Sequence, residues 1–554
     1  MVSSTATMRK GLSRSQACMR CAVIMAYLLA AGHVVALSRN QINPDAVVYV
    51  QVARHYAEGR FDLAVNSWWA PLLSWLLAPL LRTGVEPLLI LKVLGILFGL
   101  GFAFGVERLV GAMNNDKGRF VGFAAALMLA LTMLPTPVTP DLLLACLLSW
   151  YLAGSVRLID GGGWLRTFAT GLVGGLAYLA KHYTLPFVAA HLSLTFALKR
   201  LLVRRGLASG QAFKPFATAM AGTLLLALPW VAVISVHDGM LTVGSAGRFA
   251  RDFSPTGIAR PDSPPHHLLH RPRAGRMAVT ENPIEVRASR PLWSPLEGLR
   301  GIKYQTFTLF RNGIEALRHL KSADPAGLLM CGLIVSFLLL FPLRQSLASK
   351  EGVLSIWALA SVAMYVIGYC LLIVESRYLW PMWGMLIAVA IRVLGDLRRS
   401  RDPQTADEHS EQHAVSPNMT RTVRRKALTA LLLISIAYNV LLTIEDWRSY
   451  NGEEANWFRE SARKLHLGAQ VAANDYSPGL YVSYWNDSVF LGQFAGDSPE
   501  EIAEELSAYG RTSVLVFRDV ALSNRLKESA LFKESGTSAG SVKSQFMCAF
   551  EFVP

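Results

Sequence analysis

The sequence predicts a polytopic α-helical membrane protein with about eleven transmembrane helices, followed by a small C-terminal α/β domain. Three observations lead to this fold class. Hydrophobic residues make up 52% of the 554 residues and charged residues only 17%, against ~25% in typical globular proteins. Apolar segments of spanning length recur along the chain, and the net charge is +15. This composition excludes a disordered chain and a mostly soluble enzyme. We assign the basic excess to cytoplasmic loops and not to nucleic-acid binding.

The membrane part is expected to occupy residues 1–444. A bilayer-spanning helix needs about 20 mainly apolar residues. The segments that meet this requirement, some of them marginally, are 17–37, 85–106, 119–135, 138–156, 163–180, 183–198, 216–236, 326–343, 353–373, 376–394 and 427–444. The first follows several basic residues, so a cleaved signal peptide is the alternative interpretation. Its apolar run is long and lacks a clean cleavage site, which favours a retained helix.

Lysine and arginine are distributed unequally between the two sides that these spans define. With the N-terminus in the cytoplasm, every short cytoplasmic connection carries Lys or Arg, including the 199–214 loop and the basic linker 395–426. The short connections on the other side are poorer in both, as the positive-inside rule requires. We therefore predict a multi-pass protein of the cell inner (plasma) membrane. Its outer side holds a first loop at 38–84, a long loop at 237–325 and the chain after 445.

The last part of the chain, residues 445–554, has the pattern of a small soluble α/β domain. Residues 454–467 are amphipathic with a helical period, and Ser498 with Glu501 three residues later is typical of a capped helix start. The apolar stretches expected to form strands are 479–485, 512–517 and 545–553. No phosphate-binding glycine loop or catalytic triad pattern is found here, so we assign this domain no chemistry.

The first outer loop begins with an acidic residue at a helix start. A proline followed by a stretch ending in glycine predicts a helix over 45–59, with Asp45 in its first turn. Asp45, Tyr49 and Tyr56 share one face of this helix. The alternative interpretation of Asp45 is an acid favoured by the helix dipole.

A tryptophan-rich segment follows in the same loop. The segment around Trp69 is flanked by prolines and is too short to span a bilayer. It predicts an interfacial or re-entrant helix at about 71–82, with the Trp side chains at headgroup depth. An ordinary aromatic belt explains the same pattern.

Further ionisable side chains fall at the outer ends of other spans. These are Asp141 at the start of the fourth span, Lys181 and His182 after the fifth, and Glu375, Arg377 and Tyr378 between the ninth and tenth. Each one alone is explained by helix capping or by snorkelling to the interface. Together with Asp45 on the same side of the membrane, they predict a polar cavity, which is a candidate functional site.

Several short motifs follow one another in a defined order. They are Pro44 to Arg54 (PDAVVYVQVAR) followed by Glu58-Gly59, then Trp69-Ala70-Pro71-Leu72, Thr139-Pro140-Asp141, Gly174-Gly175-Leu176-Ala177 with Lys181, and Glu375 to Pro381 (ESRYLWP). The ordered set, over about residues 40–395, resembles GT-C membrane glycosyltransferases. Specifically, it is similar to the protein O-mannosyltransferase and lipid A aminoarabinose transferase superfamily. The soluble tail resembles the outer domain of the aminoarabinose transferase branch. One departure is that this family's first loop often carries two adjacent acids, whereas here Asp45 is followed by Ala46.

The resemblance implies an integral-membrane glycosyltransferase. Such an enzyme moves a sugar, with inversion, from a polyprenyl-phosphate donor to an acceptor on the outer face of the membrane. The acceptor is an envelope glycolipid, a polysaccharide or a protein, and no nucleic acid takes part. A cationic clamp must stabilise the leaving phosphate, and a carboxylate must accept the proton of the acceptor.

The candidate residues fall into three groups. Arg377, Lys181 and His182 are the candidates for binding the donor phosphate. Asp45 and Asp141 are the catalytic candidates, with Asp45 as the expected base. Tyr49, Tyr56, Trp69, Glu375 and Tyr378 are expected to line the substrate pocket. We predict no protein-bound metal site, and a divalent cation is left open as the single cofactor.

Two other functions remain open at this point. A transporter or lipid flippase is also basic and polytopic, but it is expected to carry ionisable residues near the bilayer midplane and to show related halves. A GT-C type polysaccharide ligase or polymerase is the alternative within the enzyme class.

Overall fold

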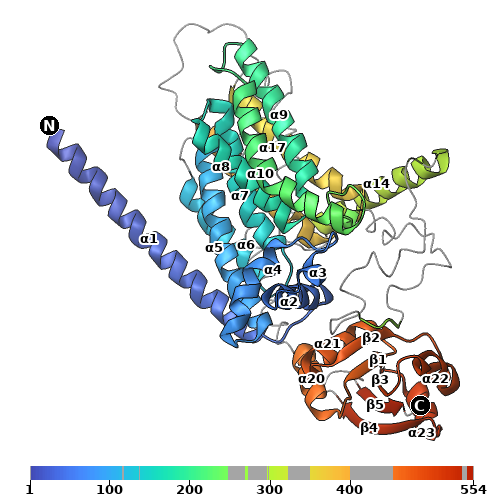
Figure 1. Cartoon of the computed structure of the whole chain (residues 1–554). Coiled ribbons are helices and arrows are strands. Elements are labelled where there is room, and N and C mark those ends of the chain that lie inside the picture. The colour runs from blue at the N-terminus through green and yellow to red at the C-terminus, as the bar shows by residue number, and fades with distance from the viewer. Residues whose placement is uncertain are drawn as a thin grey trace, which may run out of the picture.

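The computed structural model describes residues 2–114, 118–135, 138–247, 269–272, 296, 298–321, 350–399, 453–539 and 546–552. In these residues the chain forms a bundle of long helices with a small sheet domain at one end (Figure 1). The predicted spans 326–343 and 427–444 lie outside the described residues. So do most of the long loop 237–325 and of the linker 395–426.

Long apolar helices make up the membrane part. They are α1 (Val2–Leu37), α5 (Pro87–Asn114), α6 (Arg119–Met133), α7 (Asp141–Asp160), α8 (Trp164–Ala180), α9 (Thr184–Arg204), α10 (Phe213–His237), α17 (Lys350–Cys370) and α18 (Trp380–Arg399). Each predicted span that falls on described residues coincides with one of these helices. Among the described residues, six helices are long and apolar enough to cross a membrane: α1 from Ala17, α5, α7, α9, α10 and α17 from Gly352. The polytopic membrane class is therefore confirmed, while the number of crossings is not fixed at eleven.

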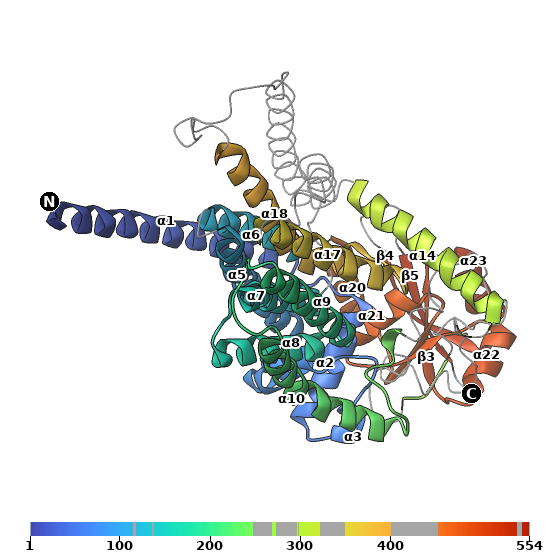
Figure 2. The same ribbon diagram turned by 90° about the horizontal axis from the view of Figure 1, so that it is seen from above.

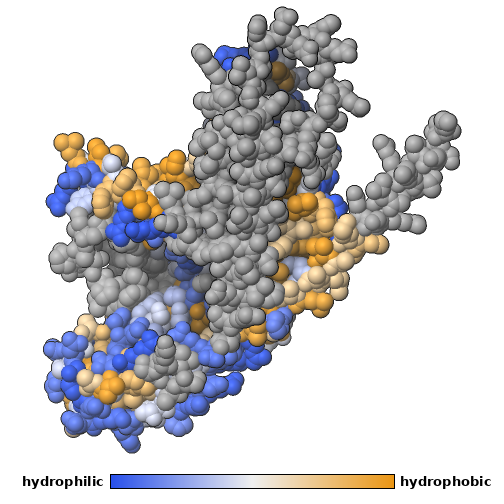
Figure 3. Space-filling view, turned by 180° about the vertical axis from the view of Figure 1, so that it is seen from behind, coloured by the Kyte–Doolittle hydropathy of each residue, from blue (hydrophilic) through white to orange (hydrophobic). Residues whose placement is uncertain are grey.

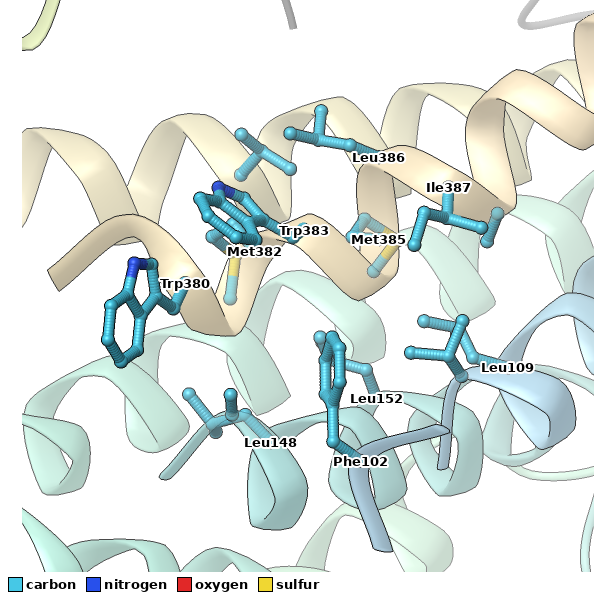
Figure 4. Close-up of a cluster of buried hydrophobic side chains, with 14 of the residues drawn as sticks. Phe102, Leu109, Leu148, Leu152, Trp380, Met382, Trp383, Met385, Leu386 and Ile387 are labelled. Carbon is cyan, nitrogen blue, oxygen red and sulfur yellow. The ribbon is translucent and has the colours of Figure 1, made fainter. Parts of the chain in front are cut away.

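The core of the bundle lies where α5, α7 and α18 pack together. Phe102 and Leu109 of α5 and Leu148 and Leu152 of α7 meet a run of large apolar side chains on α18 (Figure 4). That run is Trp380, Met382, Trp383, Met385, Leu386 and Ile387. The contacts hold α18, and with it the segment that precedes it, against α5 and α7.

Helices α8 and α10 approach each other unusually closely. A Cβ atom on Gly171 would collide with the backbone of Ala219, and one on Gly222 would collide with the backbone of Phe168. Small residues at such crossings allow membrane helices to pack backbone against backbone. The crossing fixes the end of α8, from which Lys181 follows.

The first outer loop folds into short helices across one end of the bundle. They are α2 (Pro44–Ala57), α3 (Phe61–Ala64), α4 (Leu72–Leu77) and the 3₁₀ helix η1 (Ala78–Thr83). Pro44 stands in the first turn of α2, where its missing N–H costs nothing, and Gly59 follows the helix with φ +75°. Trp75 of α4 packs edge-on against Trp230 of α10, with ring centroids 5.4 Å apart. Both helices that the sequence predicts in this loop are therefore confirmed.

The C-terminal domain is a five-stranded sheet in the order β2-β1-β3-β5-β4. Its elements are α20 (Glu453–Lys464), β1 (Gln470–Ala473), α21 (Tyr476–Asn486), β2 (Val489–Gln493), α22 (Pro499–Ser507), β3 (Thr512–Phe517), α23 (Val520–Glu528), β4 (Phe532–Ala539) and β5 (Phe546–Phe552). β2, β1 and β3 are parallel, whereas β5 is antiparallel to β3 and β4, with Val514 opposite Phe550. The predicted helix at 454–467, the Ser498–Glu501 capping box and the strands at 512–517 and 545–553 are confirmed.

The predicted strand at 479–485 is wrong, because this stretch is the helix α21. The Asp475 side chain accepts a hydrogen bond from Ser477 N and so starts the helix. Leu480 and Val482 are fully buried, and α21 contacts both its own sheet and α2 of the first outer loop. A helix buried on two sides shows no single apolar stripe, so its pattern cannot be told from that of a buried strand.

The domain is attached to the first outer loop by polar contacts as well as by this packing. Tyr484 Oη donates to Glu86 Oε1 at 3.0 Å, and Asn40 Nδ2 donates to Asn456 Oδ1 at 2.6 Å. Arg459 Nη1 donates to Asn40 Oδ1 at 2.6 Å. The domain therefore lies at the same end of the bundle as α2 (Figure 1). Its surface is mostly hydrophilic, unlike the sides of the helices (Figure 3).

Candidate active site

Ionisable side chains from separate parts of the chain meet at the end of the bundle that carries α2. Asp45 lies in the first turn of α2, and Asp141 is the first residue of α7. Lys181 follows the last residue of α8. Arg377 lies in the 3₁₀ helix η2 (Ser376–Leu379), and Glu375 is the residue before it. This short helix directly precedes α18. We call these five residues the ion cluster.

Arg377 lies at the centre of the ion cluster. Its Nη1 donates to Asp45 Oδ2 at 2.8 Å, and its Nε donates to Glu375 Oε2 at 2.6 Å. The same Nε lies 3.9 Å from Asp141 Oδ2. Burial alone lowers the pKa of Arg377, but the surrounding carboxylates outweigh it and raise the pKa above its ordinary value. The guanidinium is thus a fixed positive charge.

Asp141 is enclosed and fully bonded. Its Oδ1 accepts from Lys181 Nζ at 2.6 Å, its Oδ2 accepts from Thr139 Oγ1 at 2.8 Å, and its side chain is 2% exposed. Pro140, the residue before α7, provides no side-chain cap bond, and Asp141, the first residue of the helix, pairs with Lys181. Burial lowers the pKa of Lys181, and the pairing with Asp141 opposes that shift.

Asp45 differs from Asp141 in its access to solvent. Its side chain is 26% exposed, and Arg377 Nη1 donates a hydrogen bond to it. Burial raises the pKa of Asp45 above the ordinary range, Arg377 lowers it, and Glu375 and Asp141 raise it further. A carboxyl group with a raised pKa is a better proton acceptor than an ordinary aspartate. Asp45 is therefore a partly exposed carboxyl group of raised pKa at the mouth of the bundle.

Aromatic rings form one wall of the ion cluster. Lys181 Nζ lies 3.7 Å from the ring centroid of Tyr378, and the Tyr378 ring stacks on Tyr369 at 4.9 Å. Tyr378 Oη donates to Glu375 Oε1 at 3.1 Å. The sequence analysis missed Tyr369, although Tyr365 and Tyr369, four residues apart at the end of an apolar span just before Glu375, are a usable signal.

The other sequence candidates divide into two groups. Tyr49 packs edge-on against Trp69, with ring centroids 5.5 Å apart, and burial raises the pKa of Tyr49, with a further contribution from the charge of Asp45. The structure therefore brings Tyr49 and Trp69 to the site. It does not bring Tyr56 there, because Tyr56 packs against Phe61 and Trp75 on the far part of the loop.

His182 also points away from the ion cluster. Its Nε2 accepts a hydrogen bond from Trp230 Nε1 at 3.1 Å, and Gly244 packs directly on its ring. Burial lowers the pKa of His182 to about 4, so the ring is neutral near pH 7. A neutral imidazole brings no positive charge to a phosphate, so we do not propose His182 as a phosphate-binding residue.

The described part of the chain holds no group of three or more His, Cys, Asp or Glu side chains arranged to bind a metal ion. The divalent cation that the sequence leaves open stays a prediction. Arg377 and Lys181 are the positive charges that the described site does present.

Comparison with known proteins places this geometry in a fold. No protein-family model matches the chain, and no curated protein sequence matches it. Among solved structures, the chain is similar to ArnT from Cupriavidus metallidurans in the apo state, with a TM-score of 0.52, 13% identity and coverage of 96% of this chain and 98% of that one. For ArnT bound to undecaprenyl phosphate the TM-score is 0.51, with 13% identity and coverage of 95% and 97%. An oligosaccharyltransferase, AglB from Archaeoglobus fulgidus, has a TM-score of 0.49 and 11% identity, over 90% of this chain and 69% of that one.

The long helices, the small sheet domain and the polar mouth between them have the arrangement of a GT-C type fold. The likeness to ArnT, a lipid A aminoarabinose transferase, extends over almost the whole length of both chains. The resemblance inferred from the sequence motifs is thereby confirmed at the level of the fold.

Proposed function

We propose that this protein is a membrane glycosyltransferase that moves a sugar from a polyprenyl-phosphate donor to an acceptor hydroxyl. The observation that carries the proposal is the ion cluster, in which Arg377 contacts a partly exposed carboxyl group of raised pKa, Asp45, and Lys181 pairs with the neighbouring Asp141. The donor class is supported by the shared fold, because one of the similar structures was solved with undecaprenyl phosphate bound.

The leaving group requires positive charge. When the bond between the anomeric carbon and the phosphate oxygen breaks, the phosphate gains negative charge, which Arg377 and Lys181 stabilise. The contacts of Arg377 described above use Nε and Nη1, and a planar guanidinium with five N–H donors also accommodates a phosphate oxygen. These two residues thus form the cationic clamp.

The acceptor requires a base. As its oxygen bonds to the anomeric carbon from the side opposite the phosphate, its proton passes to Asp45, and the sugar inverts. In the present structure Asp45 is bonded to Arg377 at 2.8 Å. Donor phosphate competes for the same guanidinium, so its arrival weakens this contact and releases Asp45 for the acceptor. The order of events is then donor first and acceptor second.

The position of the ion cluster also separates this proposal from a transporter. The cluster gathers at the ends of α7 and α8 and on α2, beside the C-terminal domain, which is where a lipid-linked sugar meets a water-borne or membrane-surface acceptor. A transporter or flippase moves its substrate unchanged, whereas a transferase breaks the glycosyl–phosphate bond.

The test uses the purified full chain in proteoliposomes with a synthetic polyprenyl-phosphate sugar and an envelope extract. We expect mass spectrometry to show free polyprenyl phosphate and a glycosylated glycolipid, polysaccharide or protein, with neither product formed by the Asp45→Asn variant. Translocation of an intact donor without cleavage would overturn the proposal. Comparing envelopes from cells with and without the protein then identifies the acceptor.

We place the active site on the outer face of the inner membrane because of the lysine and arginine asymmetry of the loops. Cysteines introduced at Ser209, between α9 and α10, and at Ala508, in the C-terminal domain, report on the two sides. In a background without Cys18 and Cys21, an impermeant thiol reagent added to intact cells is expected to label position 508 and not 209. The reverse pattern would place the site in the cytoplasm.

A further inference from the structure

Helix α14 (Gly298–Lys321) packs on α17 with Ala316 buried in the core of the bundle, yet it exposes large apolar side chains elsewhere on its surface. Leu299 is 86% exposed and Phe310 is 69% exposed. The other exposed apolar residues of the helix are Ile302, Phe307, Leu309 and Ile314. The helix extends away from the bundle and across the direction of the long helices (Figures 1 and 2). Such an apolar face needs a partner.

The opposite face of α14 is fixed to the bundle. Asn312 Nδ2 donates to the carbonyl oxygens of Cys370 and Leu372, each at 3.0 Å, and Gln305 Nε2 donates to that of Leu371 at 2.9 Å. These carbonyls belong to the end of α17, where a helix leaves its last C=O groups without partners inside the helix. The bonds set the rotation of α14 about its axis, so the apolar face necessarily points outward.

Basic residues line one edge of the apolar face. Arg311 and Arg318 lie 11 and 18 residues after Arg300. This spacing brings the three arginines to one side of a helix with 3.6 residues per turn. Lys303, which is exposed, adds a further positive charge to the helix. Glu315 is the single acid in the helix sequence, and it accepts a hydrogen bond from Arg318 at 3.1 Å.

The depth of α14 follows from its attachment. The carbonyls that it holds lie within five residues of Glu375, so α14 lies at the level of the ion cluster, at the mouth of the bundle. That level is where the apolar helices end and the hydrophilic C-terminal domain begins. Figure 3 shows apolar and hydrophilic residues side by side on this projecting part of the molecule.

We propose that α14 is an interfacial helix that lies flat in the membrane leaflet next to the candidate site and binds acidic lipid headgroups. Its apolar face enters the upper acyl-chain region, and its arginine edge contacts the anionic headgroups. A second copy of this chain is disfavoured as the partner, because two such edges of like charge repel each other. The inference depends on the membrane class of the protein and not on its activity.

The test uses the full chain without Cys18 and Cys21, in nanodiscs that each hold one copy. A bimane label is attached to Phe310→Cys on the apolar face or, as a control, to Ala508→Cys in the C-terminal domain. With lipids brominated in the upper acyl chain, we expect roughly threefold or more stronger quenching at position 310 than at position 508. Equal quenching at the two positions would overturn the proposal. In a second preparation, discs hold two copies of the chain. If the label at position 310 is protected from solvent only in those discs, the apolar face is a dimer contact, and this result would also overturn the proposal.

A second measurement tests the charge component. Replacing phosphatidylglycerol by phosphatidylcholine in the discs is expected to reduce quenching at position 310. In the triple variant Arg300→Gln, Arg311→Gln, Arg318→Gln, the same exchange of lipids is expected to have little effect. A wild-type chain whose quenching is insensitive to lipid charge would contradict the assignment of acidic headgroups.

Discussion

Asp45 and Asp141 belong to the same ion cluster and both face Arg377, yet their surroundings differ. Asp45 lies on a loop helix, has a 26% exposed side chain and is bonded to Arg377. Asp141 lies at the start of a membrane helix, has a 2% exposed side chain and is bonded to Lys181 and Thr139. One carboxylate is accessible at the mouth, and the other is enclosed by its partners.

The difference indicates separate tasks for the two residues, in line with the sequence analysis, which names both as catalytic candidates and Asp45 as the expected base. An enclosed and paired carboxylate holds structure together, since removing one partner leaves a charge buried without compensation. An accessible carboxylate of raised pKa is able to exchange a proton with a bound acceptor. The predictions below test this division, beginning with the largest expected effect.

The Asp45→Asn variant is expected to lose transfer by about 10²–10⁴-fold, because general base catalysis contributes about that much. Insertion, folding and donor binding are expected to survive, since Asn and Asp are about equal at helix starts. Sugar transfer from a synthetic polyprenyl-phosphate donor, at matched protein levels, measures the loss. Asp62→Asn, an exposed aspartate in the same loop, is the matched control and should transfer normally. Near-normal activity of Asp45→Asn would remove Asp45 as the base.

The Arg377→Ala variant is expected to weaken donor turnover by about 10²-fold or more, as loss of an electrostatic stabiliser commonly does. Arg377→Lys should restore only part of it, because a point charge does not replace a planar fork. The exposed Arg82 of η1 provides the control variant, Arg82→Ala. Unchanged transfer by a folded Arg377→Ala sample would show that Arg377 is only an ion-pair residue at the helix end.

The sequence predicts the membrane class, the helices of the first loop and the members of the ion cluster. These are predictable because bilayer thickness sets the length of each span and because ionisable residues at span ends are few. What the sequence does not contain is the pairing. Asp45 and Arg377 are 332 residues apart in the chain, and their contact follows from how α2 and α18 both pack on α5.

The failures have local physical causes. The stretch 479–485 reads as a strand because α21 is buried on two sides. His182 follows Lys181 directly, so the sequence places both at the site, but successive residues in the tight turn between α8 and α9 point in different directions. Lys181 therefore meets Asp141, whereas His182 meets Trp230.

The Asp141→Asn variant is expected to affect stability more than chemistry. The substitution leaves Lys181, which is half-buried, without its anionic partner. This lowers the free energy of unfolding by about 3 kcal/mol. Thermal unfolding in detergent measures this cost, and Asp160→Asn at the other end of α7 is the control, because the Asp160 side chain is 49% exposed and pairs with Lys350 at the surface. Residual transfer should exceed that of Asp45→Asn. Loss of transfer in Asp141→Asn alone would assign the base to Asp141 and reverse the comparison.

The smallest expected effect concerns His182, which is enclosed like Asp141 and whose pKa burial lowers. Its pKa is about 4 in the folded chain, against about 6.5 when unfolded. Because the folded value is the lower one, the unfolded state binds the proton more readily as the pH falls. The stabilisation of the folded chain by the neutral His182 ring is complete above about pH 6.5 and declines toward pH 4. At pH 5 the free energy of unfolding is lower by about 2 kcal/mol.

His182→Asn isolates this contribution, because an amide oxygen can still accept the hydrogen bond from Trp230 Nε1 but does not titrate. We expect wild-type thermal stability in detergent to fall between about pH 7 and about pH 5, and the fall to be smaller in the variant by about 2 kcal/mol. His237→Asn, at the exposed end of α10, should keep the wild-type slope. Equal slopes in wild type and His182→Asn would mean that the ring is hydrated in the folded protein. In that case His182 would be an accessible group like Asp45, and its assignment to donor phosphate would have to be reopened.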